Sequence, residues 1–129
     1  PTCMDDLVSA LGGVAVDWPF KTECCGASLS ISNPKVVDRL GYRLLEMAQR
    51  AGAQCIAVAC PLCQLNLDLR QGDAVKAHGA LGAMAILYIT QLLGLALGLP
   101  AGDLGLDALV VSPKALLEPL NMAAAEGIS

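Results

Sequence analysis

Apolar and polar residues alternate along this chain with two different periods, and each period predicts one kind of element. Between Asn33 and Gly52 the apolar residues recur every three or four positions, which predicts an amphipathic helix. Asn33 suits the N-cap position and Pro34 the first helical position, while Gly52 suits the left-handed residue that follows a helix. A shorter helix is predicted over residues 2–11.

Short apolar runs rich in β-branched residues predict the strands. Such runs occupy residues 14–18, 55–59 and 83–88, and a short edge strand is expected at 110–112. The run at 55–59 is apolar throughout, so we expect it to be a central strand that is buried on both faces.

Further helices are expected at 62–71, where Gly72 would end the helix, at 89–97 and at 115–125. Helices and strands therefore alternate, which predicts an α/β fold: a small parallel sheet of three to four strands with helices on both faces. The whole chain, 1–129, is expected to form a single domain. In such sheets ligands bind beyond the carboxyl ends of the strands.

Composition changes this picture in two ways. Hydrophobic residues make up 55% of the 129 residues and aromatic residues only 3%, so the core must be aliphatic. Charged residues make up 16%, below the usual value of about 25%, which favours a subunit of a larger assembly. The net charge of −4 and the lack of a Lys/Arg cluster give no reason to expect a nucleic-acid partner.

One long apolar stretch, residues 77–102, raises the question of a membrane span, because His78 is its only ionisable residue. Several glycines interrupt the stretch, Thr90 and Gln91 add polar groups, and Pro100 ends it without flanking basic anchors. We therefore expect a buried strand followed by a buried helix, and no membrane span.

The cysteines carry the candidate chemistry. A CCG motif at residues 24–26 and a CPLC motif at 60–63 each follow a predicted strand, so their thiols should meet at one edge of the sheet. CxxC is a chelating spacing, whereas an adjacent pair is better suited to bonding different metal atoms of one cluster. Thiolates select iron–sulfur clusters or zinc over hard cations. The candidate ligands are Cys24, Cys25, Cys60 and Cys63.

Other interpretations of the same cysteines stay open. Four thiolates could hold a structural zinc ion, the CxxC could act alone as a redox pair, or the cysteines could be inert core residues. A disulfide framework is disfavoured, because the Leu- and Ala-rich chain can form a core without cross-links. Paired cysteines in such a chain indicate a reducing compartment, and hence the cytoplasm.

Further residues with reactive or polar side chains are expected to have structural or surface roles. They are Cys55 in the core, Cys3 as a partly exposed thiol, His78 in solvent, Gln64 and Asn66 on a helix surface, and Trp18 and Tyr88 in packing.

The two motifs, Cys24-Cys25-Gly26 and Cys60-Pro61-Leu62-Cys63, resemble those of the cysteine-rich CCG domain in the B subunit of heterodisulfide reductase and its relatives. The likeness extends to residues 6–19, 60–71 and 86–94, which with the motifs covers nearly the whole chain. It implies that this chain is the C-terminal part of a longer, two-domain subunit.

The resemblance also implies a cofactor, a noncubane [4Fe–4S] cluster with zinc as the alternative. In the family the ligands are a lone upstream cysteine, the CC pair and the CxxC pair, so Cys24, Cys25, Cys60 and Cys63 would be ligands here. The lone cysteine usually lies further upstream than Cys3, so this chain would supply four of five ligands. We therefore expect that the chain alone is inactive, and its site could be empty, form a disulfide or hold a zinc ion.

By the same resemblance the full protein would be an oxidoreductase subunit that reduces a disulfide or oxidises thiols. Electrons would come from a ferredoxin-like iron–sulfur partner subunit, with a flavin subunit as a further partner. Related CCG proteins serve succinate, fumarate, lactate or glycolate oxidoreductases, so the substrate stays open. The alternative function is a zinc-binding module that docks subunits without catalysis.

Overall fold

The computed structural model of the chain describes residues 2–118. Its elements alternate between helix and strand, with two short 3₁₀ turns. In chain order they are α1 (Cys3–Ala10), η1 (Ala27–Leu29), α2 (Pro34–Arg50), β1 (Cys55–Val58), α3 (Pro61–Leu69), α4 (Gln71–His78), β2 (Ala85–Tyr88), α5 (Ile89–Ala96) and η2 (Leu106–Ala108).

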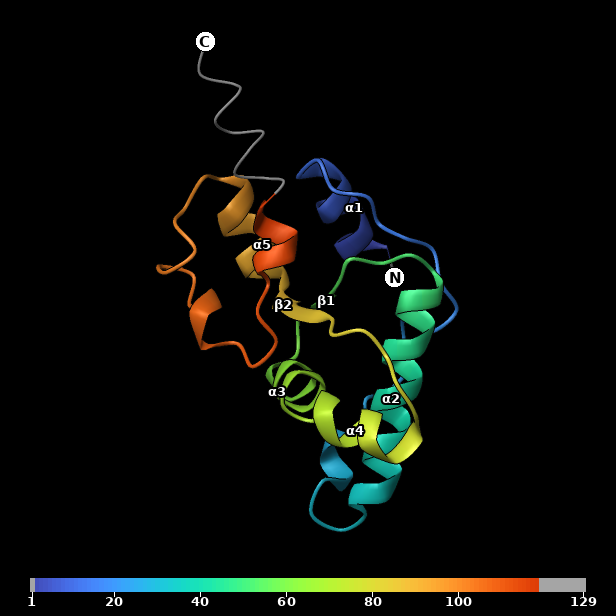
Figure 1. The fold of residues 1–129 in the computed structure, drawn as a ribbon. Helices are drawn as coiled ribbons and strands as arrows, with labels where there is room; N and C mark the ends of the chain where they lie inside the picture. Colours follow the sequence, from blue (N-terminus) through green and yellow to red (C-terminus); the bar gives the residue numbers. More distant parts are fainter. Residues whose placement is uncertain (1, 119–129) are drawn as a thin grey trace.

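The strands β1 and β2 pair in parallel, with Cys55 opposite Ala85 and Val58 opposite Tyr88. The crossover between them consists of α3 and α4. Helices cover both sides of the sheet, as the sequence predicts. In Figure 1, α1 and α5 lie above the strands, α3 and α4 lie below them, and α2 runs up the right-hand side to their level.

Helix α2 begins and ends where the sequence predicts. Asn33 takes the N-cap position and Pro34 the first helical position, although the Asn33 side chain makes no capping hydrogen bond. Gly52 has a φ of 79°, the left-handed conformation that glycine adopts most easily. The buried side of α2 is centred on Val37 and Leu44.

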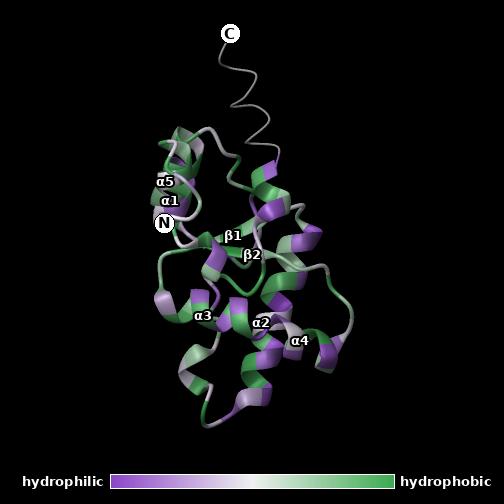
Figure 2. Cartoon of the chain, turned by 60° about the vertical axis from the view of Figure 1, so that its left-hand side comes forward, coloured by the Kyte–Doolittle hydropathy of each residue, from purple (hydrophilic) through white to green (hydrophobic). Residues whose placement is uncertain are grey.

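The core lies where α2, the two strands and α3 meet. Figure 2 shows the strands in green between helices whose turns alternate between purple and green, as expected for amphipathic helices. The buried residues of this cluster are Cys25, Leu44, Leu45, Ala48, Val58, Leu67, Met84 and Ile86. Trp18 and Tyr88 pack against the cluster, which confirms their predicted role in packing.

The sheet is smaller than predicted, because only two strands form among the described residues. Residues 14–18 are irregular, and the Val14 side chain is 85% exposed. Residues 110–112 form no strand either, because the N–H groups of Val110 and Val111 donate to the carboxylate of Asp68. The strand β1 was predicted to be central, but it has a single partner among the described residues. Three of its four residues are only half-buried.

Two other predictions need correction or completion. The helix predicted at 62–71 is two helices, since α3 ends at Leu69 and α4 begins at Gln71, so that Gly72 lies inside a helix. Residues 114–118 are helical, and the remainder of the helix expected at 115–125 lies outside the described residues.

The apolar stretch 77–102 forms the end of α4, the strand β2 and the helix α5. The strand is buried as predicted, but the helix is not, because Gly94 is the one buried residue of α5. Within residues 2–118, no helix has the length and apolar character needed to cross a membrane.

The core position of Ile86, which is fully buried in β2, gives the first testable prediction. We expect Ile86→Ala to lower the free energy of unfolding by about 2–5 kcal/mol, because it removes apolar contacts and leaves a cavity. Urea unfolding followed by circular dichroism measures this loss. Leu97→Ala is the control, because Leu97 is 71% exposed, and its effect should stay within about 0.5 kcal/mol. Similar losses in the two variants would contradict the assigned core.

Candidate metal centre

The CPLC segment, residues 60–63, joins the carboxyl end of β1 to the start of α3. Cys60 is the N-cap residue of α3, with an extended backbone, and its side chain is exposed. Pro61 occupies the first helical position, where its missing N–H leaves no hydrogen bond unmade. Cys63 lies in the first turn of the helix and is half-buried. This turn therefore presents one thiol to solvent and turns the other inward.

The CCG segment, residues 24–26, precedes η1 and depends on its glycine. Gly26 has a φ of 76°, a conformation that residues with a side chain rarely adopt. A Cβ atom at this position would also lie 2.8 Å from Cδ1 of Leu40. Cys24 is exposed and its Sγ accepts the N–H of Gly26 at 3.3 Å, whereas Cys25 is buried in the core.

The two segments meet, as the sequence predicts. The Sγ atom of Cys25 lies 3.3 Å from the Sγ atom of Cys63, although 38 positions separate the two residues. A second contact joins the same parts of the chain, since Nδ2 of Asn66 in α3 donates to the backbone carbonyl of Cys25 at 2.9 Å. The predicted strand at 14–18 is not needed to bring the CCG segment to this position.

The thiols of the CPLC turn differ in their acidity. The pKa of Cys60 is lowered, because the backbone N–H groups of Cys63 and Leu62 stabilise its thiolate. Burial raises the pKa of Cys63 to about 12, and the neighbouring Cys25 thiol adds to the shift. Cys60 is thus the more readily ionised thiol of the two, whereas Cys63 must lose a proton when a metal binds.

The cysteine sulfur atoms of this site are donors of the chemical type that an iron–sulfur cluster or a zinc ion needs. Residues 2–118 contain no cluster of three or more His, Cys, Asp or Glu side chains already arranged around one point as a metal site. The structure does bring Cys25 and Cys63 together at the first turn of α3, and Cys60 is the N-cap residue of the same helix. All of these donors are soft sulfur atoms, and all six cysteines of the chain are free. Such donors suit an iron–sulfur cluster or zinc.

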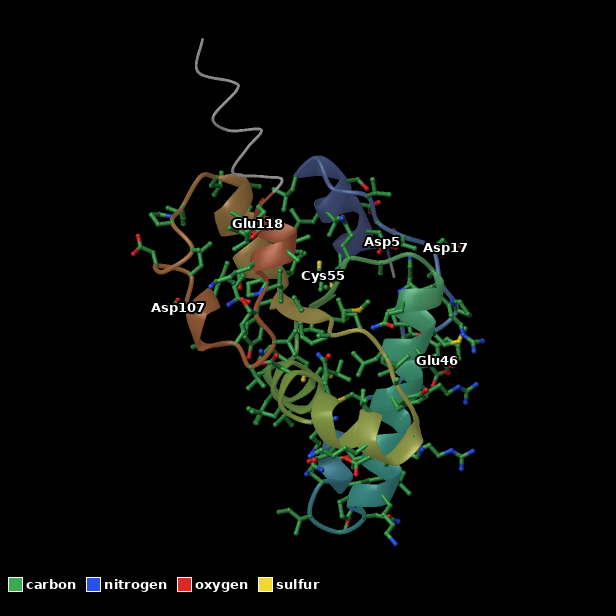
Figure 3. The ribbon with its side chains drawn as sticks, in the orientation of Figure 1. Asp5, Asp17, Glu46, Cys55, Asp107 and Glu118 are labelled. Carbon is green, nitrogen blue, oxygen red and sulfur yellow. The ribbon has the colours of Figure 1, made fainter. Side chains whose placement is uncertain are left out.

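The remaining candidate residues lie elsewhere. Cys55 begins β1, at the end of the strand opposite Cys60, and Figure 3 shows it near α1 and α5. It is partly buried, and burial raises the pKa of its thiol, as expected for a residue with a core role. Cys3 and His78 are exposed, as predicted.

Sequence reasoning misplaced two residues of α3. Gln64 and Asn66 were predicted to lie on a helix surface, but both are buried. For Asn66 the error arises because the residue that its amide contacts, Cys25, is distant in sequence. One signal was available: Asn66 lies three positions after Cys63 and so shares its helix face.

Comparison with known proteins finds one matching family model and several relatives of the chain. The sequence model of the CCG family, described as a cysteine-rich domain, matches residues 3–68. The chain is 34% identical over 116 residues to the 8-methylmenaquinol:fumarate reductase membrane anchor subunit of Wolinella succinogenes, covering 90% of this chain and 41% of that protein.

Two archaeal relatives match at a similar level. One is the B subunit of the ferredoxin/F(420)H(2)-dependent CoB-CoM heterodisulfide reductase of Methanosarcina acetivorans, 35% identical over 109 residues. The other is the B subunit of the ferredoxin:CoB-CoM heterodisulfide reductase of Methanosarcina mazei, 34% identical over 110 residues. Each alignment covers 83% of this chain and 36% of the relative, so the chain spans roughly two fifths or less of the curated relatives it matches.

The left-handed backbone of Gly26 gives a prediction for the CCG segment. Gly26→Ala should lower the free energy of unfolding by about 1–2 kcal/mol, because the added Cβ makes this conformation unfavourable. Chemical denaturation measures the change. Gly102→Ala is the matched control, since Gly102 has no positive φ and no atom lies within 4 Å of an added Cβ. Equal destabilisation by both substitutions would contradict a special role for Gly26.

The acidity of the thiols gives a second prediction. In metal-free, reduced protein, Cys60 should be alkylated by iodoacetamide with a midpoint at lower pH than Cys55, because the pKa of Cys60 is lowered and that of Cys55 is raised. Pulse labelling over a pH series, followed by peptide mass spectrometry, measures both midpoints. In the unfolded chain the two midpoints should converge. A folded-state midpoint of Cys60 at or above that of Cys55 would refute the assigned environments.

Proposed function

This chain belongs to the CCG cysteine-rich domain family, and from that premise we propose that it is the iron–sulfur domain of a heterodisulfide reductase B-like redox subunit. The observation that carries the proposal is the contact between Cys25 and Cys63, which unites the two motifs of the family in one place. Two of the relatives are named as heterodisulfide reductase subunits and a third as a fumarate reductase subunit.

The proposed ligands are Cys24, Cys25, Cys60 and Cys63, and the proposed group is a noncubane [4Fe–4S] cluster. Such a cluster would supply single electrons for the cleavage of a disulfide bond or accept them from thiols. The four thiols would play no acid–base part, and their role would be to bind the metal and set its surroundings.

The surroundings of these thiols support the proposal. Cys25 and Cys63 are covered by the core, and an apolar, water-poor setting is one of the factors that set the potential of a cluster. Both thiolates of the CPLC turn would lie at the N-terminus of α3, where the helix dipole favours negative charge. Cys24 and Cys60 are exposed and thus accessible to a metal donor or to a substrate sulfur.

The wider assignment follows from the relatives. We propose that the chain corresponds to the C-terminal domain of a two-domain subunit and that the whole protein is an oxidoreductase acting on a disulfide or a thiol. Its electron partners would be a ferredoxin-like iron–sulfur subunit and a flavin subunit. The free thiols are consistent with a reducing compartment, and we place the protein in the cytoplasm.

A second candidate function is a zinc module that docks subunits. It is favoured by the exposed leucines on α3, next to the CPLC turn, since Leu62, Leu65 and Leu69 are each more than half exposed. Ile31, in the loop after η1, is fully exposed as well. Large apolar side chains in solvent often mark the surface on which a protein partner packs.

Metal content decides between the two functions. Protein purified without oxygen should be brown and contain iron together with acid-labile sulfide if the cluster forms, and a mixture reconstituted with iron and sulfide should give the same result. Colourless protein that takes up one zinc ion per chain and no sulfide would establish the docking module instead.

The ligand assignment gives a paired prediction. Cys60→Ser should lower the bound metal at least several-fold, because it replaces a thiolate that the proposal places in the centre. Cys55→Ala should leave the metal content unchanged, since Cys55 begins β1 at the opposite end of the strand. Elemental analysis of both variants, prepared side by side, gives the answer. An equal loss in both would overturn the assignment of Cys55 to the core.

A further inference from the structure

The buried amide of Asn66 is a feature that the proposed ligand set does not use. Asn66 lies in α3, three residues after Cys63, and only 7% of its surface is exposed. Its Nδ2 atom donates to the backbone carbonyl of Cys25 at 2.9 Å. Residues three apart on a helix lie on the same face, so Cys63 and Asn66 approach the CCG segment side by side.

This arrangement holds Cys25 at two points. Its thiol lies 3.3 Å from that of Cys63, and its carbonyl accepts the hydrogen bond of Asn66. These two contacts from one face of α3 fix the distance of the Cys25 backbone from the helix. They also fix how the Cys25 backbone is rotated relative to the helix. A single contact between sulfur atoms would leave that rotation free.

The CCG segment packs in the core but makes few other hydrogen bonds to the rest of the molecule. Among the described residues, the backbone hydrogen bonds of residues 22–33 stay within residues 20–37, and the bond between Gly26 and Cys24 is internal to the segment. Apart from the thiol contact, the Asn66 amide therefore makes the one hydrogen bond that joins residues 24–26 to a part of residues 2–118 outside residues 20–37.

The rest of the Asn66 side chain contributes little to stability. Its Oδ1 atom is buried and has no hydrogen-bond partner within residues 2–118. A buried amide with an unpaired oxygen is a costly choice for a helix interior, where a leucine of similar size would carry no such cost. The residue is therefore better explained by the direction of its one hydrogen bond than by a contribution to the core.

We propose that Asn66 is a positioning residue that holds the Cys25 backbone so that the Cys25 thiol faces Cys63. This role adds to the proposed cysteine centre and depends on the proposed function in one respect, namely that Cys25 and Cys63 are ligands there. The positioning itself belongs to the metal-free protein and can be measured without a cofactor.

The test uses the thiol–disulfide equilibrium of the pair. In protein carrying Cys24→Ser and Cys60→Ser, Cys25 and Cys63 are the remaining thiols of the centre. Oxidised glutathione converts the two thiols into one disulfide and is reduced to two molecules of glutathione. The equilibrium constant of this exchange reports how well the fold holds the two sulfur atoms together, and peptide mass spectrometry identifies the bond.

In this background we expect Asn66→Leu to lower the equilibrium constant at least tenfold, because the Cys25 carbonyl loses its anchor. Asn66→Ala removes the same donor and should also lower the constant, which decides the question if the leucine variant does not fold. The matched control is Asp68→Asn, another buried polar residue of α3, whose carboxylate holds Val110 and Val111 instead. It should reduce stability to urea but change the constant less than threefold.

An unchanged constant in folded Asn66→Leu or Asn66→Ala protein would overturn the positioning role, and so would an equal loss in Asp68→Asn. Neither result touches the iron and sulfide content of the unmodified protein, which tests the proposed function separately.

Discussion

The arrangement of the whole molecule depends on polar side chains that reach from the crossover helices to distant backbone. Asn66 holds the CCG segment, Asp68 holds residues 110–111, and Gln71 bonds both the N–H and the carbonyl of Met84 just before β2. In a larger parallel sheet, neighbouring strands would supply such bonds. Here the sheet has two strands, and side chains of α3 and α4 satisfy backbone groups that no ladder reaches.

The same crossover gives the cysteine centre two different environments. Its inner side consists of Cys25 and Cys63, which are part of the core or packed against it. Its outer side consists of Cys24 and Cys60, which face solvent. Burial raises the pKa of the half-buried Cys63, whereas backbone N–H groups stabilise the thiolate of the exposed Cys60 and lower its pKa. The cysteine centre at the N-terminus of α3 therefore has an inner side covered by the core and an outer side accessible to solvent.

The parts of the structure that local chemistry decides could be predicted from the sequence. Helix α2 follows from Asn33, Pro34 and Gly52, because caps and φ preferences act within a few residues. The strand predictions at 14–18 and 110–112 were wrong, because a strand forms only where a second backbone pairs with it, and local sequence does not show whether one does. For 110–112 the partner turned out to be a carboxylate.

At the candidate centre, too, some features could be predicted from the sequence and others could not. The two cysteine segments meet as predicted, although the prediction placed each after a strand and the strand at 14–18 does not form. The burial of Asn66 could not be derived from its own neighbours along the chain. It depends on the contact of α3 with a segment whose closest residue, Cys25, is 41 positions away. Long-range contacts of this kind leave only a weak trace in one sequence.

The two-stranded sheet has a consequence for the behaviour of the chain in solution. Each strand is an edge strand, and among the described residues β1 has a ladder partner on one side only. Such an edge can add a strand from another molecule, because its free N–H and carbonyl groups are already spaced for pairing. A further strand or a covering segment on that side of β1 would close this edge.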